Sequence, residues 1–216
     1  MRFSEASADA MASSAAPTIR VPRPRRGKHN RRMEILQTLA ALLEDPRCDR
    51  ITTAQIAKKL NLSEAALYRN FSSKAQMFDA LISFIETSLM GLFAQIREDE
   101  HLTHLARVQE MIRVMLLFAE KNRGLVRLMT GQALMKENPA LTERMSHIID
   151  KLESGLKQAL REAVLAQELP ADFNASGRAS LIMNWVAGRW LRFVLTGFKT
   201  TPGDVSAIAM SPFFAK

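Results

Sequence analysis

Apolar residues recur at helical spacing through most of the chain, and this pattern begins sharply at residue 30. From Asn30 to Glu44 the leucine and isoleucine side chains fall on one stripe, which predicts an amphipathic helix. Asp45-Pro46 should end that helix, because proline pushes the preceding residue out of the α region. No alternation of polar and apolar residues rises above noise, so the pattern predicts helices without a sheet.

The pattern predicts about eight helices in all. After the first, a short helix should begin near Thr53, and a third should run from a Ser63 cap to Phe71. A long helix of about seven turns should follow the Ser72-Ser73 pair and carry apolar residues as far as Ile96. Stops rich in Asn, Pro and Gly then divide the rest into predicted helices near 102–121, 124–136, 140–167 and 174–197.

The composition is that of an ordinary soluble globular protein, since 47% of the 216 residues are hydrophobic and 24% are charged. No uninterrupted apolar run approaches the roughly 18 residues that a membrane span needs. The first 32 residues lack the apolar stretch of a secretory signal. We therefore expect a cytoplasmic protein outside the membrane. The single cysteine, Cys48, has no second thiol with which to form an internal disulfide.

Positive charge is concentrated at the start of the chain. Residues 1–32 hold eight Lys and Arg against two acids, Glu5 and Asp9, so they supply +6 of the net charge of +8. Pro17, Pro22 and Pro24 interrupt any helix there, and the composition predicts a disordered basic tail over residues 1–28. Such a tail suits a polyanion, although a merely solubilising role stays open at this point.

Residues 51–71 have the layout of a helix-turn-helix. A recognition helix of this kind buries one face and offers the other to a groove roughly 12 Å wide, so its outward side chains cannot all be large. Ala65 and Ala66 meet that requirement. The same layout occurs in helical proteins that never bind DNA, and the neighbouring basic tail is what favours DNA here. The polar candidates are Ser63, Tyr68 and Lys74 for phosphates, and Glu64, Arg69 and Asn70 for base edges.

The same residues resemble the DNA-binding domain of the TetR superfamily. The string from Leu67 to Lys74 reads L-Y-x-x-F-x-S-K, a pattern specific to that superfamily. Further strings, among them Arg50-Ile51-Thr52-Thr53 and Thr130 to Met135, are similar to the nucleoid occlusion factors of the SlmA type within it. The resemblance covers most of residues 30–135 and thins towards the C-terminus.

The resemblance implies an all-α fold, in which a three-helix helix-turn-helix domain at 29–74 is joined by a long helix to a helical regulatory and dimerisation domain at 75–216. It implies a nucleoid-associated homodimer that binds palindromic double-stranded DNA. Bound to chromosomal sites, such a dimer inhibits FtsZ-driven septum assembly over the nucleoid. Carried over by position, the DNA contacts are Arg31, Arg50, Thr52, Ser63, Ala65, Ala66, Tyr68, Arg69 and Lys74.

The resemblance also implies a groove for the C-terminal tail of FtsZ between the predicted fourth and fifth helices. Carried over, that groove includes Phe84, Lys121 and Asn122. The sequence departs from the family pattern here, because Leu92 stands where the family has a basic residue and Leu117 replaces a glycine. These changes fall on the FtsZ groove.

The last predicted helix carries Trp185, Gly188, Arg189 and Trp190. Gly188 permits the close approach of another helix, and aromatic residues with arginine are typical of interface anchors. We therefore assign this helix, with the one at 140–167, to a two-fold dimer interface. A monomer that packs both tryptophans internally is the alternative.

A ligand-responsive transcriptional repressor is the second function that the sequence allows. Met111, Met115, Phe118, Met129 and Met135 lie where TetR-type repressors often house a small-molecule inducer, although ordinary core packing is favoured. His101 and His104 have no third ligand nearby, so no metal site is predicted. No phosphate-binding glycine loop or nucleophile motif is found, and we expect neither a cofactor nor enzyme activity.

Overall fold

The computed structural model describes residues 28–45, 50–204 and 211–214, and within those ranges it contains eight α-helices, one short 3-10 helix and no strand. The predicted all-helical fold is confirmed. Residues 1–27 of the predicted basic tail, and Cys48, lie outside the described residues. The helices are α2 (Lys28–Leu43), α3 (Thr53–Lys59), α4 (Glu64–Tyr68), α5 (Lys74–Glu98), α6 (His104–Lys121), α7 (Arg123–Met129), α8 (Pro139–Leu165), α9 (Ala175–Leu195) and the 3-10 helix η1 (Ser211–Phe213).

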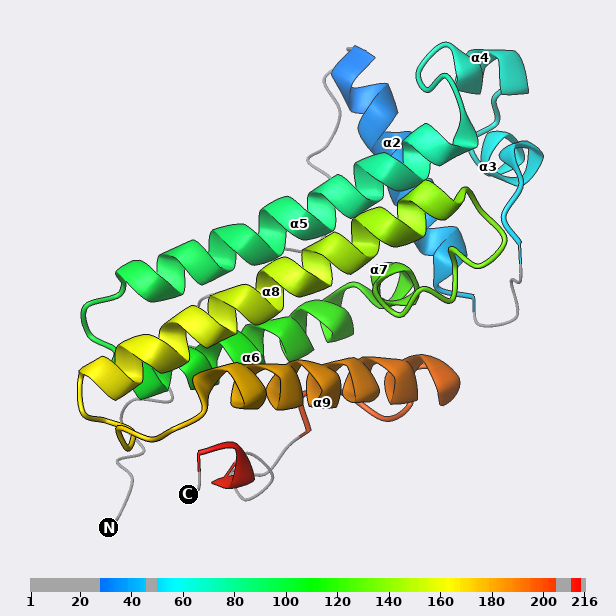
Figure 1. The fold of residues 1–216 in the computed structure, drawn as a ribbon. Coiled ribbons are helices and arrows are strands. Elements are labelled where there is room, and N and C mark those ends of the chain that lie inside the picture. The colour runs from blue at the N-terminus through cyan, green and yellow to red at the C-terminus, as the bar shows by residue number, and fades with distance from the viewer. Residues whose placement is uncertain (1–27, 46–49, 205–210, 215–216) are drawn as a thin grey trace.

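The long helices form a bundle, and α2, α3 and α4 lie at one end of it. In Figure 1, α5 and α8 run side by side, with α6 and α9 beneath them. α8 packs against α5, α6 and α9, and α6 packs against α5, α7, α8 and α9, so these two helices connect the bundle. α2 packs against both α5 and α7 and thereby joins the N-terminal helices to the rest.

One continuous cluster of buried apolar side chains runs through all eight helices. In α2, the buried residues Ile35, Leu39 and Leu43 recur every four positions, as the sequence pattern predicts. Even the five-residue α4 contributes Leu67 to this cluster. The N-terminal helices therefore share a core with the bundle.

Polar side chains cap the starts of most helices. Thr52, Ser63, Ser73, Thr103 and Asn138 each accept a hydrogen bond from a backbone N–H in the first turn of the helix that follows. Such caps satisfy donors that have no partner inside the helix. The starts predicted at Ser63 and at Ser72-Ser73 are thus close to those observed.

The predicted helix at 124–136 is wrong at its C-terminal end, because α7 stops at Met129. Thr130 leaves the helical path, and Gly131 follows with a φ of 73°, a left-handed conformation that favours glycine. Residues 130–138 form turns instead. One of them, Met135, is 83% exposed, so it does not line a core cavity with Met111 and Met115 as the inducer hypothesis requires.

α5 is the one helix in the described ranges that is long and apolar enough to cross a membrane by length and composition. Its apolar residues recur at helical spacing and are buried within the bundle, as in a core helix. They are Met77, Phe78, Leu81, Ile82, Ile85, Leu89, Leu92, Phe93 and Ile96.

Candidate nucleic-acid interface

α3 and α4 are fixed by hydrogen bonds at their starts and by a tight turn between them. The Thr52 hydroxyl accepts from the backbone N–H of Gln55 at 3.2 Å, and the Gln55 side chain accepts from the backbone N–H of Thr52 at 2.8 Å. Asn61 makes the turn with a φ of 52°. The Ser63 hydroxyl then accepts from the backbone N–H of Ala66 at 3.2 Å. Both helices begin with a side-chain cap, and these caps help to fix the direction of α4.

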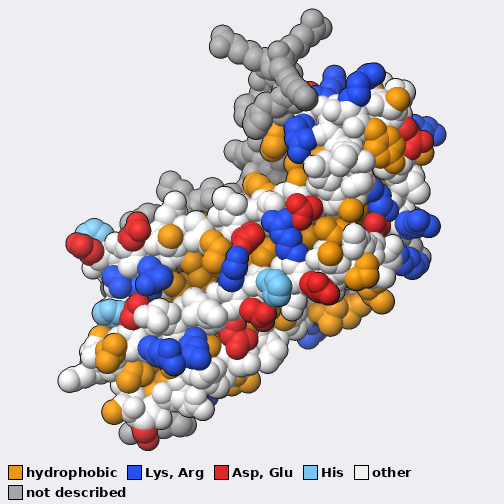
Figure 2. Space-filling view, turned by 45° about the horizontal axis from the view of Figure 1, so that its top comes forward, with side chains coloured by type: hydrophobic (Ala, Val, Ile, Leu, Met, Phe, Trp, Pro, Cys, Tyr) orange, Lys and Arg blue, Asp and Glu red, His pale blue; other side chains and the backbone are white. Residues whose placement is uncertain are grey.

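The two helices bury one face and expose the other. Ile56, Leu67 and Phe71 are buried in the common core. In Figure 1, α4 lies at the end of the molecule opposite the loop that joins α5 to α6. Lys and Arg side chains gather over that end in the space-filling view (Figure 2). On α4 and its two caps, the exposed residues are Ser63, Glu64, Ala65, Tyr68 and Arg69, and Tyr68 is 46% exposed.

The end of α4 is built differently from the prediction, which extended this helix to Phe71. The Asn70 side-chain amide donates to the carbonyl oxygen of Ala66 at 3.0 Å, and Arg32 donates to the Asn70 carbonyl oxygen. The Arg32 guanidinium also lies 4.0 Å above the centre of the Phe71 ring, a cation–π contact. Asn70 therefore closes the helix, and its contact with a base edge stays a prediction.

Arg32 positions the end of α4, a role that the sequence does not show. The sequence shows a cation at the start of α2, whereas its partners lie nearly forty residues away. Arg31 points elsewhere and pairs with Glu34 at 2.7 Å while staying 45% exposed. Arg50 and Thr52 are exposed beside α3. Glu64 accepts a hydrogen bond from the Thr53 hydroxyl at 2.6 Å, so its carboxylate ties α4 to α3.

The sequence pattern predicts that Lys74 contacts a phosphate, but in this structure its ammonium group is bound within the chain. Its Nζ donates to the carbonyl oxygen of Ile51 at 2.9 Å and to the Glu137 carboxylate at 2.6 Å. The side chains of Lys74 and Glu137 are 19% and 10% exposed. Lys74 therefore joins the start of α5 to the turn before α3 and to the segment after α7. Its contact with a DNA phosphate stays a prediction.

α7 holds the C-terminal end of α2. Arg127, which is only 3% exposed, donates to the carbonyl oxygens of Leu43 at 3.2 Å and Asp45 at 2.8 Å. A cation at the C-terminus of a helix interacts favourably with its dipole. Gly124 lies directly against the backbone of Ala40. The sequence alone does not distinguish a buried arginine on a short helix from an exposed one, so the role of Arg127 could not be predicted.

The three residues predicted for a partner groove lie on α5, at the end of α6 and at the junction of α6 and α7. Phe84 on α5 is half-buried, and its ring lies 6.4 Å from the ring of Phe118 on α6. The Asn122 side chain donates to the Phe118 carbonyl oxygen at 2.9 Å and is 6% exposed. Lys121 is exposed at the end of α6. Leu92 lines a cleft between α5 and α6, and Leu117 is half-buried.

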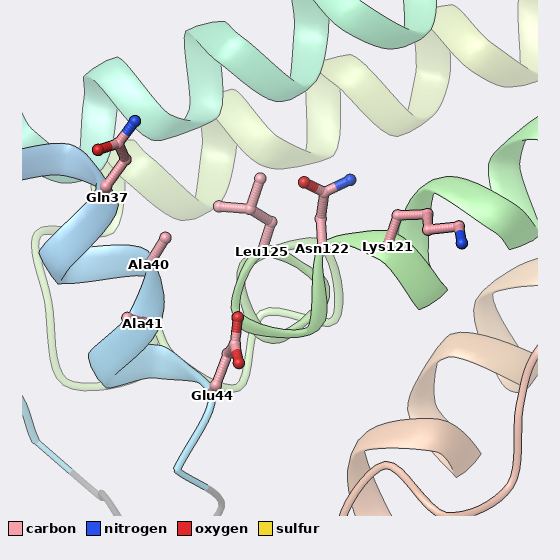
Figure 3. A pocket seen from close by; sticks show the side chains of 8 residues that line it. Gln37, Ala40, Ala41, Glu44, Lys121, Asn122 and Leu125 are labelled. Atoms are coloured by element: carbon pink, nitrogen blue, oxygen red, sulfur yellow. The ribbon is translucent and has the colours of Figure 1, made fainter. Parts of the chain in front are cut away.

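A pocket of about 200 Å³ opens where α2 meets the junction of α6 and α7. Figure 3 shows that Ala40 and Ala41 of α2 form one wall and that Asn122 and Leu125 face them. Glu44 reaches in from the end of α2. The remaining lining residues are Gln37, Lys121 and Gly124.

The residues predicted for the dimer interface separate into core and surface. Trp190 is fully buried and donates its indole N–H to the carbonyl oxygen of Met115 at 3.2 Å. Its assignment to an interface is therefore wrong, because it packs within one chain. Trp185 is half-buried and packs edge-on against Phe213 of η1 at 5.2 Å between ring centres. Arg189 donates to the carbonyl oxygens of Thr201, Pro202 and Asp204.

Gly188 lies on a face of α9 that is exposed in the single chain. A Cβ atom added to it would meet nothing within 4 Å. Apolar residues share this face, seven positions before Gly188 and three and seven positions after it: Leu181, Leu191 and Leu195 are 47%, 44% and 69% exposed. Large apolar side chains repeated along one helix in this way mark a surface suited to contact with another molecule.

Comparison with protein families identifies both halves of the chain. Residues 35–81 match the model for bacterial regulatory proteins of the tetR family, and residues 102–214 match a SlmA-like model described as a tetracyclin repressor-like C-terminal domain. The nucleoid occlusion factor SlmA of Idiomarina loihiensis is 43% identical over 177 residues, which cover 82% of this chain and 90% of that protein. The chain belongs to the SlmA family of nucleoid occlusion factors. The SlmA protein of Aliivibrio fischeri is 46% identical over 178 residues, with the same two coverages of 82% and 90%.

Solved structures confirm the TetR-like fold at much lower identity. The transcriptional regulator FadR from Bacillus subtilis, in complex with stearoyl-CoA, superposes with a TM-score of 0.68 at 16% identity and covers 85% of this SlmA-family chain and 97% of its own. FadR from Bacillus halodurans gives a TM-score of 0.70 at 12% identity, with coverages of 89% and 97%. These four proteins are named as nucleoid occlusion factors or transcriptional regulators rather than as enzymes.

Proposed function

We propose that this protein is a nucleoid occlusion factor of the cytoplasm, which binds palindromic chromosomal DNA as a homodimer and, when bound, inhibits FtsZ-driven septum assembly over the nucleoid. The observation that carries the proposal is the extent of the similarity. The identity to SlmA proteins spans 82% of the chain, and the C-terminal half matches a SlmA-like domain separately from the helix-turn-helix. The general tetR-family model, by contrast, matches residues 35–81 alone.

The exposed face of α4 supports the DNA-binding part of the proposal. Ala65 leaves room for close approach to a groove, while Ser63, Tyr68 and Arg69 surround it and are exposed. Arg31, Arg50 and Thr52 lie on the neighbouring elements and are also exposed, which suits contacts to the phosphate backbone. Residues 29–74 would form the reading domain, and residues 75–216 the domain that dimerises and binds the partner.

The exposed stripe on α9 supports the homodimer. Leu181, Gly188, Leu191 and Leu195 repeat along one face, and Gly188 allows the same helix of a second copy to approach closely. Substituting Gly188 by Glu should convert the dimer to a monomer and reduce DNA affinity, because both half-sites can no longer be read at once. Sedimentation at micromolar concentration measures this, with Ala94→Glu on the exposed face of α5 as the matched control. A dimeric Gly188→Glu variant would contradict the assignment.

The groove between α5 and α6 supports a peptide partner, proposed to be the C-terminal tail of FtsZ. The half-buried ring of Phe84 lies against the buried ring of Phe118, and Lys121 lies exposed at the end of α6. At Leu92 and Leu117 this groove is more apolar than the family pattern, so we expect apolar side chains of the tail to contribute more to binding here.

Three clefts on the described surface lie at α2–α7, at α5–α6 and between the end of α8 and the start of α9, and none of the three is lined by Met111, Met115 or Phe118. These side chains are fully buried. No observation here favours a ligand-responsive repressor.

A polymerisation assay with purified components tests the proposal. A duplex is first selected from random sequence by the purified protein, and this duplex serves as the operator. FtsZ polymers are then sedimented with the protein alone, with the duplex alone and with both. We expect polymer loss only when protein and duplex are present together. Equal amounts of polymer in all three mixtures would contradict the proposal.

A further inference from the structure

The pocket between α2 and α7 has the size of a single side chain rather than of a small-molecule ligand. Its volume is about 200 Å³, and sites for drug-sized ligands begin at about 300 Å³. Ala40, Ala41 and Leu125 provide an apolar lining that one large aliphatic or aromatic side chain would fill. A buried anchor side chain in a pocket of this kind is a common source of affinity in peptide recognition.

The pocket shares two residues, Lys121 and Asn122, with the groove proposed for the partner tail. Phe84 contacts Phe118, and Phe118 accepts a hydrogen bond from Asn122, which lines the pocket. Lys121 lines the pocket too. A peptide that contacts Lys121 and Asn122 at the end of α6 therefore lies at the α2–α7 pocket.

The rim of the pocket carries both signs of charge. Glu44 on α2 and Lys121 on α6 are exposed, and within the described ranges no ion pair engages either side chain. An occupant with an acidic group near Lys121 and a basic group near Glu44 would be complementary to this rim. A purely acidic or purely apolar segment would not.

We propose that the α2–α7 pocket is the end of the partner groove and takes one apolar side chain of the bound tail, with charged groups of the tail facing Lys121 and Glu44. This inference rests on the proposed function, because it assigns a further contact to the same peptide. Its consequence is that the first helix of the DNA-binding unit forms part of the partner site. The tail then contacts both functional units of the protein at once.

Ala41→Lys tests the pocket. Ala41 is exposed, so a long side chain there covers the entrance without entering the core. Binding of a synthetic peptide of the FtsZ C-terminal tail is measured by fluorescence anisotropy in the presence of the selected duplex. We expect about a tenfold or greater loss of peptide affinity for Ala41→Lys. The matched control Ala94→Lys, on the exposed face of α5, should keep wild-type peptide affinity. DNA affinity and thermal unfolding should be unchanged in both.

Glu44→Lys tests the charged rim. It should weaken binding of the wild-type peptide, and the loss should disappear when the basic residues of the peptide are replaced by Gln. If the wild-type protein binds the peptide and Ala41→Lys matches Ala94→Lys, the pocket assignment is wrong while the proposed function stands. If the wild-type protein does not bind the peptide at all, the proposed function itself is contradicted, and this inference with it.

Discussion

The α-carbon of Gly124 lies so close to the backbone of Ala40 that a Cβ atom on Gly124 would stand 2.1 Å from the Ala40 carbonyl oxygen. That oxygen belongs to a helix backbone and cannot move aside cheaply. Gly124→Ala should therefore destabilise the fold by about 1–3 kcal/mol, the cost of overpacking, although alanine is the better helix former. Urea unfolding measures this free energy.

Gly91→Ala is the matched control. Gly91 lies within α5, and a Cβ atom there would meet nothing within 4 Å. The substitution should stabilise the protein by about 0.5–1 kcal/mol through the unfolded chain and helix propensity. If Gly124→Ala also stabilised the protein, the contact with Ala40 would not restrict residue 124.

The Lys74–Glu137 pair should contribute measurably to stability. Its side chains are 19% and 10% exposed, so water screens the charges less than at the surface. A double-mutant cycle with Lys74→Met and Glu137→Gln should give a coupling energy on the order of 1–3 kcal/mol. The Arg97–Glu162 pair, with Arg97 50% exposed and a distance of 3.4 Å, is the comparison and should give about 0–1 kcal/mol. Equal coupling in the two cycles would contradict the role given to Lys74.

Glu168 should make stability depend on pH at the acid end. Burial of its carboxyl raises the pKa, but hydrogen bonds from the backbone N–H groups of Leu105 and His104 outweigh it, and the pKa is lowered overall. A lowered pKa in the fold stabilises at pH values above the ordinary Glu pKa of about 4.3 and loses that contribution as the pH falls through the lowered value.

Glu168→Gln isolates this effect. At pH 7 the substitution should cost about 0.5–2 kcal/mol, because it weakens the capping of the first turn of α6. The difference from wild type should shrink as the pH falls below the ordinary Glu range, and urea titrations at pH 7 and pH 3 measure it. A difference that is the same at both pH values would show that the charge of Glu168 does not matter.

Ala65→Glu should abolish tight DNA binding without unfolding the protein. Ala65 is exposed on α4, and a glutamate there adds bulk and negative charge where a duplex would approach. We expect at least a tenfold loss of affinity for the selected duplex, about 1.4 kcal/mol or more. Ala94→Glu should retain affinity. Duplex binding by Ala65→Glu equal to that of Ala94→Glu would mean that α4 is not the reading helix.

Local chemistry explains why the helices were largely predictable. Apolar period and capping residues are properties of neighbouring positions, so the stripe at Ile35, Leu39 and Leu43 and the Ser63 cap are visible in the sequence. The observed end of α7 differs from the prediction because the helix ends just before Gly131, although apolar residues continue beyond it. The sequence does not show whether a glycine inside a helical pattern adopts the left-handed conformation that ends a helix.

Contacts between distant residues explain what the sequence could not predict. Lys74 has the spacing of a phosphate contact, yet Glu137, far along the chain, takes its ammonium group. Trp190 has the composition of an interface anchor, yet the carbonyl of Met115 satisfies its indole N–H within the core. Whether a polar side chain faces DNA, a partner or its own chain depends on such pairings.

The affinity of the FtsZ tail peptide, measured with and without the selected duplex at one salt concentration, tests the central claim most directly. A nucleoid occlusion factor acts where it is bound, so the duplex should increase peptide affinity, and by linkage the peptide should increase duplex affinity by the same factor. A coupling of about 1–3 kcal/mol corresponds to roughly 5-fold to 150-fold. Peptide binding that is absent, or identical with and without the duplex, would contradict the account.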